Sequence, residues 1–258
     1  MIKWIKFLGK KIFLSLMMAA MITACNQSDD TSADNSVENG TDTSAVGGQD
    51  WVPLFNGKTF AGWHVYGMDS VGKAWKIEDS VIHLTALEKN RWQTASGSDL
   101  VTENEFSNFD LKLEWKISEA GNSGIFFYVH EDINRFKNPN ESGLEMQIND
   151  DANNKIEKIE MQKAGDLAGL LSSSSAKVVK PAGQWNQVEI RSNRGKLDFF
   201  INGQSVLSTT LWDDNWEDLI ENSKFKKMDD YGTYKKGRIA LQDHGADVWF
   251  RNIMIKKL

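Results

Sequence analysis

The chain has 258 residues, a formal net charge of −6 and an isoelectric point near 5.3. Acidic and basic residues are interspersed, which argues against nucleic acid as a partner. Cys25 is the only cysteine, so the rest of the chain has no internal disulfide, no thiol nucleophile and no cysteine-based zinc site.

Residues 1–24 have the pattern of a lipoprotein signal peptide. Four lysines precede an apolar run, Ile12 to Ile22, which is too short to span a bilayer. Cys25 directly follows small residues, in the position of the lipidated cysteine of the bacterial lipobox. We therefore predict an exported lipoprotein, anchored to the outer membrane on its periplasmic or cell-surface side.

Residues 25–49 are rich in Ser, Thr, Asp, Asn and Gly and contain little that a core could bury. Such a composition predicts a disordered acidic tether. The folded part is then expected over residues 50–258, a length that suits a single all-β domain.

Alternating apolar and polar residues predict short antiparallel strands through the first half of this domain. Residues 74–86 indicate a hairpin, and another strand begins at Leu100. Residues 109–118 are the clearest strand, with Leu111 among the inward residues and Lys116 on the outward face.

Between residues 121 and 150, two strands combine a core face with a polar face. Alternation places Leu144, Met146 and Ile148 opposite Glu145, Gln147 and Asn149. The same rule places Ile125, Phe127 and Val129 opposite Phe126, Tyr128 and His130. An acid, amides and aromatic rings on one outer face would suit sugar binding, whereas a solvated sheet face is the plainer interpretation.

The second half of the domain continues the β pattern with one helix. Residues 153–163 have helical spacing or form a long loop, and hairpin turns are indicated at 193–195 and 202–203. Residues 216–225 predict a short amphipathic helix. The last strands contain a predicted bulge near Arg251 and Asn252, which we expect to tie the last strand to a neighbour.

Several separated motifs together resemble the bacterial 3-keto-disaccharide hydrolase domain family. They are LFNGKTFAGW, NSGIFF, GLEMQI, PAGQWNQVEI and LQDHGADVWFRNIMIKKL. The resemblance implies a concanavalin-A-like jelly-roll sandwich, which agrees with the strand pattern. One departure is Ala168, because many relatives have an aromatic residue after Gly-Asp-Leu; this leaves the substrate preference open.

The resemblance also implies a reaction on glycosides whose C3 hydroxyl is oxidised to a ketone. Such a site needs a base near C2, an acid near the leaving oxygen and donors for the enolate oxygen. Alternation brings Glu145 and His244 into one groove if their strands are adjacent, and either is a candidate for the base. Turn formation is the plainer role for His244.

Further residues are candidates for holding the substrate. Lys116 would stabilise the enolate charge, and the remaining candidates for binding are Asn122, Tyr128, Gln147 and Gln242. The other histidines have no metal-ligand spacing, so we predict no cofactor, although a Glu/His/Asp set could hold a divalent cation.

Two other functions compete with this hypothesis. One is a non-catalytic carbohydrate-binding lipoprotein on the same scaffold. The other is an ordinary glycosidase, which needs a second carboxylate at a set distance from Glu145. Asp150 and Asp243 are the nearest candidates along the chain, and alternation places neither with Glu145.

Overall fold

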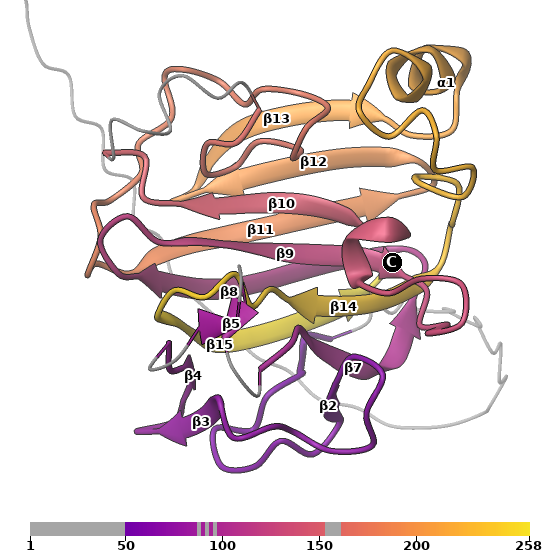
Figure 1. Cartoon of the computed structure of the whole chain (residues 1–258). Coiled ribbons are helices and arrows are strands. Elements are labelled where there is room, and N and C mark those ends of the chain that lie inside the picture. The colour runs from indigo at the N-terminus through magenta and orange to yellow at the C-terminus, as the bar shows by residue number, and fades with distance from the viewer. Residues whose placement is uncertain (1–49, 87–88, 91–92, 95–96, 153–160) are drawn as a thin grey trace, which may run out of the picture. The chain divides into compact units, whose positions relative to one another are not determined.

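Two antiparallel sheets pack face to face in the computed structural model (Figure 1). The larger sheet consists of β1 (Val52–Pro53), β3 (Trp75–Glu78), β4 (Val81–Leu84), β8 (Phe109–Ile117), β11 (Asn186–Asn193), β12 (Lys196–Ile201), β13 (Gln204–Thr210) and β15 (Val248–Lys257). The smaller sheet consists of β2 (Trp63–Val65), β7 (Leu100–Phe106), β9 (Asn122–Val129), β10 (Leu144–Asn149) and β14 (Gly237–Leu241).

The order of the larger sheet is β13-β12-β11-β8-β15-β4-β3, with β1 paired to β15, and that of the smaller sheet is β10-β9-β14-β7-β2. A separate ladder joins β5 (Lys89–Asn90) to β6 (Gln93–Thr94). One α-helix, α1 (Asp214–Glu221), and one 3-10 turn, η1 (Pro139–Glu141), complete the described elements. The predicted all-β jelly-roll sandwich is confirmed.

The structure describes residues 50–86, 89–90, 93–94, 97–152 and 161–258. The signal peptide, Cys25, the tether and most of the 153–163 segment lie outside the described residues, so these remain predictions. In the described ranges, no helix has both the length and the apolar character needed to cross a membrane.

Strand alternation fills the space between the sheets with apolar side chains. Leu111 and Leu113 from β8 and Met146 and Ile148 from β10 are each at most 1 % exposed and belong to one core cluster. Burial of this apolar surface is the main favourable contribution to folding. The prediction that Leu144, Met146 and Ile148 face inward, and Glu145 outward, is confirmed.

The predicted turns and the predicted bulge are present. The β11–β12 and β12–β13 hairpins turn at residues 194–195 and 202–203, and β15 shifts register between Arg251 and Met254. Arg251 Nε and Asn252 Nδ2 donate to the Glu114 carboxylate at 2.8 and 2.9 Å, so both residues tie β15 to β8 as expected. The helix begins two residues earlier than predicted, after an Asp213 cap.

The prediction that Tyr128 lies on the outer face is wrong. Tyr128 has a φ of +59°, and β9 carries an extra residue opposite β14, so the alternation inverts at this bulge. Phe127 and Tyr128 both face the core, and Val129 faces outward. The Tyr128 hydroxyl donates to the Ser107 carbonyl at 2.6 Å, so its role is structural.

Candidate active site

Glu145 lies on the outer face of the smaller sheet, beside a row of residues that crosses four strands. Gln147 on β10 is in register with Gly124 on β9. Gln242 follows β14, and its N–H donates to the Gly124 carbonyl at 2.9 Å. Asp99 precedes β7 at the position that the β14–β7 register places beside Gln242. Because Gly124 has no side chain, it leaves a space in this row of otherwise polar residues.

The Glu145 carboxyl group fills this space. A Cβ added at Gly124 would lie 2.0 Å from Glu145 Oε1 and 2.8 Å from its Cδ. Glu145 Oε1 and Gln242 Oε1 are both buried, and within the described residues neither accepts a hydrogen bond. Buried acceptors without donors are costly. We use the word hollow for the surroundings of these two acceptors over Gly124, and a ligand that brings hydroxyl groups would satisfy them.

The surroundings of Glu145 shift its titration into the neutral range. Burial, and then the charge of Asp99, raise the pKa of Glu145 to about 8, against the opposing effect of the Lys224 ammonium. Burial likewise raises the pKa of Asp99 to about 8, although an N–H from Asp243 lowers it. A carboxyl group with this pKa becomes a strong base once ionised.

The other half of the same sheet face is apolar and covered. Tyr66, Val101, Phe126 and Ala240 form a second buried cluster with Val129. The Tyr66 hydroxyl donates to the Phe136 carbonyl at 3.1 Å, so the segment that follows β9 packs over this cluster. The aromatic rings that share this face with Glu145 are therefore buried and do not form an open stacking platform.

His244 lies in the loop that follows β14. The sequence argument put Glu145 and His244 in one groove on the condition that β14 adjoins β10, and this condition is not met, because β9 lies between the two strands. The loop is nevertheless fixed next to the hollow. Ser123 Oγ donates to the Gln242 carbonyl at 2.9 Å, and the Asp243 N–H donates to Asp99 Oδ1 at 2.7 Å. His244 itself is half-buried.

The two acids proposed for an ordinary glycosidase are engaged elsewhere. Asp243 is fully buried, and its carboxylate accepts hydrogen bonds from Thr94 and from the Gly245 N–H. Asp150 Oδ2 accepts from the Ala120 N–H at 2.9 Å. Both carboxylates are therefore engaged by donors of the chain itself.

The predicted amides fall into two groups. Gln147 is 3 % exposed, and its Nε2 donates to Asn122 Oδ1 at 2.8 Å and to the Ser123 carbonyl at 2.9 Å. Its amide therefore orients Asn122 rather than meeting a ligand. Asn122 is half-buried on the same face, and Gln242 borders the hollow.

Lys116 does not belong to this site. It lies on the outer face of the larger sheet, where its Nζ is 4.3 Å from the Trp249 ring centre and 5.2 Å from that of Trp185. The predicted role in enolate stabilisation is therefore wrong for Lys116. Its outward orientation was predicted correctly, but alternation cannot tell which of two sheets a strand joins.

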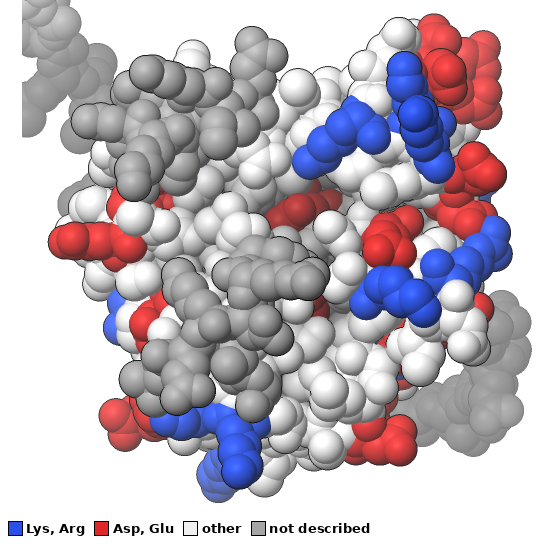
Figure 2. Space-filling view, in the orientation of Figure 1, with Lys and Arg blue, Asp and Glu red and all other residues white. Residues whose placement is uncertain are grey.

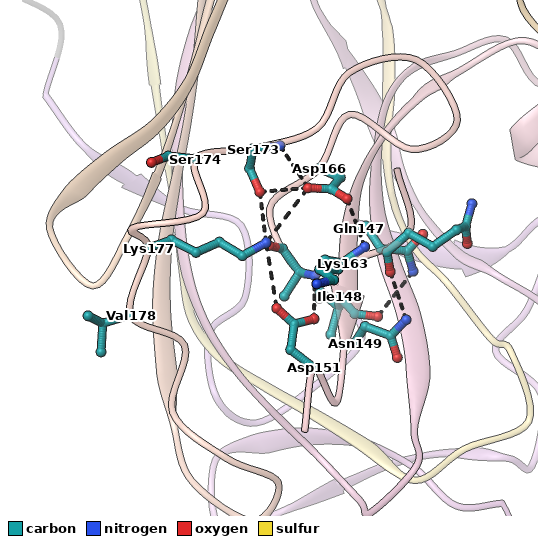
Figure 3. Close-up of polar contacts among 12 residues, drawn as sticks. Gln147, Ile148, Asn149, Asp151, Lys163, Asp166, Ser173, Ser174, Lys177 and Val178 are labelled. Carbon is teal, nitrogen blue, oxygen red and sulfur yellow. Dashed lines mark hydrogen bonds and ion pairs between the residues drawn. The ribbon is translucent and has the colours of Figure 1, made fainter. Parts of the chain in front are cut away.

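The edge of β10 that faces away from β9 forms hydrogen bonds with residues 166–168, and a buried polar network fixes that segment. The Ala168 N–H donates to the Glu145 carbonyl, and the Gln147 N–H donates to the Asp166 carbonyl, both at 3.0 Å. Figure 3 shows the Lys177 ammonium among Asp166, Asp151 and Ser173, with Ser173 Oγ at 2.7 Å. This network fixes the segment that borders Glu145.

Sequence reasoning missed Asp99, Lys224 and Tyr231. Asp99 precedes its strand, and the other two residues come from the segment after α1, so periodicity gave no signal for any of them. Figure 2 shows acidic surface in a recess near the middle of this face, with basic side chains to its right. Among the described residues, no group of three or more His, Cys, Asp or Glu side chains is arranged to hold a metal ion.

A model of the 3-keto-alpha-glucoside-1,2-lyase-like domain matches residues 50–256. The chain belongs to this family. A 3-keto-disaccharide hydrolase of Bacteroides thetaiotaomicron is 36 % identical over 228 residues, which are 81 % of this chain and 78 % of that protein.

Solved structures agree with the family assignment. A Parabacteroides distasonis protein assigned to the glycosyl hydrolases is 32 % identical, with a TM-score of 0.71 over 81 % of this chain and 94 % of its own. A second such protein from the same organism is 26 % identical, with a TM-score of 0.64 over 81 % and 100 % of the two chains. A Bacillus subtilis protein with a galectin-like fold, 14 % identical with a TM-score of 0.52 over 81 % and 94 %, shares the fold alone.

The raised pKa of Glu145 predicts a specific dependence of stability on pH. The pKa of Glu145 rises from an ordinary 4.5 to about 8 on folding, so its stabilising effect is complete below pH 4.5 and is lost as pH rises through 8. Glu145→Gln should therefore unfold at a higher temperature than the wild type above pH 8, by about 2 °C or more. Thermal unfolding followed by circular dichroism across this pH range measures the difference.

Glu103→Gln is the matched control, because Glu103 is an exposed carboxyl on β7 in the same sheet. Its unfolding temperature should follow the wild type at each pH. A Glu145→Gln curve that coincides with the wild type throughout would contradict the raised pKa of the buried Glu145 carboxyl group.

The network around Lys177 predicts a large loss of stability on its removal. The Lys177 side chain is 8 % exposed and that of Asp166 is 3 % exposed, so Lys177→Met leaves a buried carboxylate without its cation. We expect the free energy of unfolding to fall by about 3 kcal/mol. Urea denaturation measures this change, with Lys163→Met as control because Lys163 contacts Asp166 through its backbone N–H and carbonyl, which the substitution keeps. Equal effects of the two variants would refute the network's importance.

Proposed function

We propose that the protein cleaves glycosides whose C3 hydroxyl has been oxidised to a ketone. A C3 ketone acidifies the C2 proton, and removal of this proton forms an enolate with its charge on O3. The enolate then expels the aglycone from C1 and leaves a C1=C2 enone. Addition of water, with hydroxyl to C1 and hydrogen to C2, completes a net hydrolysis.

Glu145 takes the C2 proton in this proposal. Its pKa of about 8 makes the ionised form a far stronger base than an ordinary carboxylate, while a usable fraction remains ionised near neutral pH. His244, on the loop anchored beside the hollow, protonates the leaving oxygen. Asn122 and Gln242 bind sugar hydroxyls, and Gln242 Oε1 is a buried acceptor that a hydroxyl would satisfy.

The observation that carries the proposal is the Glu145 carboxyl group, whose Oε1 is buried over Gly124 without a donor among the described residues, in a chain of this family. The name of the Bacteroides relative, a 3-keto-disaccharide hydrolase, supports an enzyme that cleaves a carbohydrate of this class. The buried state of Tyr66 and Phe126 counts against an open stacking platform of the binding-module type.

An ordinary glycosidase mechanism is less well supported. The carboxyl group that acts electrostatically on Glu145 is Asp99, which is 2 % exposed and accepts from the Asp243 N–H. Asp99 is buried and already accepts from a backbone N–H, so it is not an accessible second carboxyl group of the kind that flanks the glycosidic bond in glycosidases.

The test is cleavage of a 3-keto-glucoside and its unoxidised parent by the wild type and by two variants. The wild type should release the aglycone from the keto substrate alone, with kcat/KM rising through about pH 8 as Glu145 ionises. Glu145→Gln should lower kcat at least about 100-fold. Gly124→Ala should do likewise while the protein stays folded, because its Cβ displaces the flexible end of Glu145.

Each alternative has its own outcome in this test. Aglycone release from the unoxidised parent would establish an ordinary glycosidase. Binding of either sugar without release, measured by calorimetry, would replace the enzyme by a carbohydrate-binding protein.

We also propose that the protein is a lipoprotein held at the outer membrane through Cys25. The basic start, the short apolar run and the position of the single cysteine support this location. Metabolic labelling with palmitate should modify the wild type, whereas Cys25→Ser should remain unlabelled and leave the membrane fraction. Equal labelling of both forms would rule out lipidation at Cys25.

A further inference from the structure

Enolate formation places a negative charge on O3, and an enzyme that accelerates this step needs a donor or cation at that atom. Lys116 cannot supply it, because it lies on the larger sheet between Trp185 and Trp249. A different lysine, Lys224, acts electrostatically on Glu145. It is not used by any step described above.

Lys224 reaches the site from the segment that follows α1. Its side chain lies across Gly169, where an added Cβ would be 2.4 Å from Lys224 Cε and 2.9 Å from Nζ. Gly169 directly follows Ala168, whose N–H donates to the Glu145 carbonyl at 3.0 Å. The absence of a side chain at position 169 thus lets the ammonium approach the border of the hollow.

Two stacked, buried rings lie beside the ammonium end of Lys224. The Phe225 ring stacks on Tyr231 with centroids 3.7 Å apart and an angle of 6° between the planes. Lys224 Nζ lies 4.9 Å from the Phe225 ring centre. Within the described residues this ammonium forms no ion pair with a carboxylate, and the residue is exposed, so its N–H donors are available to a ligand.

Three charged or titratable groups interact electrostatically with Glu145, and each comes from a part of the chain distant from β10. Asp99, at the start of β7, raises the pKa of Glu145 after the larger effect of burial, and Lys224 lowers it. Tyr231 is the third, because burial and then the Glu145 charge raise the pKa of its hydroxyl. Lys224 is the cation of this set.

We propose that Lys224 is a catalytic residue that donates a hydrogen bond from its ammonium to O3 of the substrate as the enolate forms. This inference rests on the proposed function. The C2–H bond breaks and its proton passes to Glu145, while the electron pair forms C2=C3 and places the charge on O3. Lys224 keeps its proton. The pair then forms C1=C2 as the C1–O bond breaks, and the aglycone leaves with a proton from His244.

The experiment compares the wild type with Lys224→Met, Lys224→Arg and Lys226→Met on a 3-keto-glucoside, with kcat and KM measured across pH. Lys226 is the matched control, an exposed lysine two residues away that lines the cleft beside α1. Lys224→Met should lower kcat by about 100-fold to 1,000-fold, as loss of an oxyanion donor does. Lys224→Arg, which keeps the charge, should stay within about tenfold of the wild type.

A second readout does not require turnover. Because the Lys224 ammonium lowers the pKa of Glu145, Lys224→Met should shift the Glu145 titration to higher pH, whereas Lys226→Met should leave it in place. Carbon-13 NMR of the labelled glutamate carboxyl groups, with Glu145→Gln to assign the signal, measures this shift directly. The rising limb of the pH–rate profile should move in the same direction.

The outcomes separate this inference from the proposed function. A wild type that cleaves no 3-keto-glycoside overturns both. A wild type that cleaves it, with Lys224→Met unchanged in kcat or altered in KM alone, overturns only the role of Lys224. An unchanged Glu145 titration in Lys224→Met also overturns it, because the ammonium would then not be near the carboxyl group.

Discussion

The Glu145 carboxyl group occupies the space over Gly124 that any other residue there would fill with a Cβ. Burial is unfavourable for an ionised carboxyl group, and together with the charge of Asp99 it raises the pKa of Glu145. Contacts elsewhere must offset the cost of a buried carboxyl group on this strand. The Asp166–Lys177 network, the Ala168 N–H and the Gln242 backbone all fix elements that border this hollow.

The smaller sheet therefore has two different halves on its outer face. One half packs Tyr66, Val101, Phe126 and Ala240 into an apolar cluster that contributes to stability. The other half holds Asp99 and Glu145, carboxyl groups with raised pKa values that reduce stability as pH rises. Strain of this kind is typical of functional sites, because a site organised for a bound substrate is not optimised for the empty protein.

Fold similarity alone would not separate an enzyme from a sugar-binding protein here. Jelly-roll sandwiches support many functions, and a solved structure at 14 % identity shows only the shared architecture. The family match and the relative at 36 % identity support a hydrolase that cleaves carbohydrates, while the roles of individual residues are proposals that rest on the geometry around Glu145. Residue type alone does not identify a binding residue. Tyr128 was a candidate because aromatic rings bind sugars, but the inverted alternation at this position makes it part of the core.

The sequence by itself determined the all-β class, the strand faces of β8 and β10, the hairpin turns and the outward position of Glu145. These features depend on local chemistry, namely a two-residue period and glycine or asparagine at turns. It also identified the family, because its motifs are contiguous stretches of the chain.

Only the tertiary structure decided which residues meet Glu145. Strand order placed β9 between β10 and β14, a bulge turned Tyr128 inward, and sheet assignment moved Lys116 to the opposite side of the sandwich. The same packing brought Asp99 and Lys224 to Glu145 from distant parts of the chain. Alternation fixes the face on which a side chain lies, but pairing between strands far apart in sequence depends on how the whole core packs.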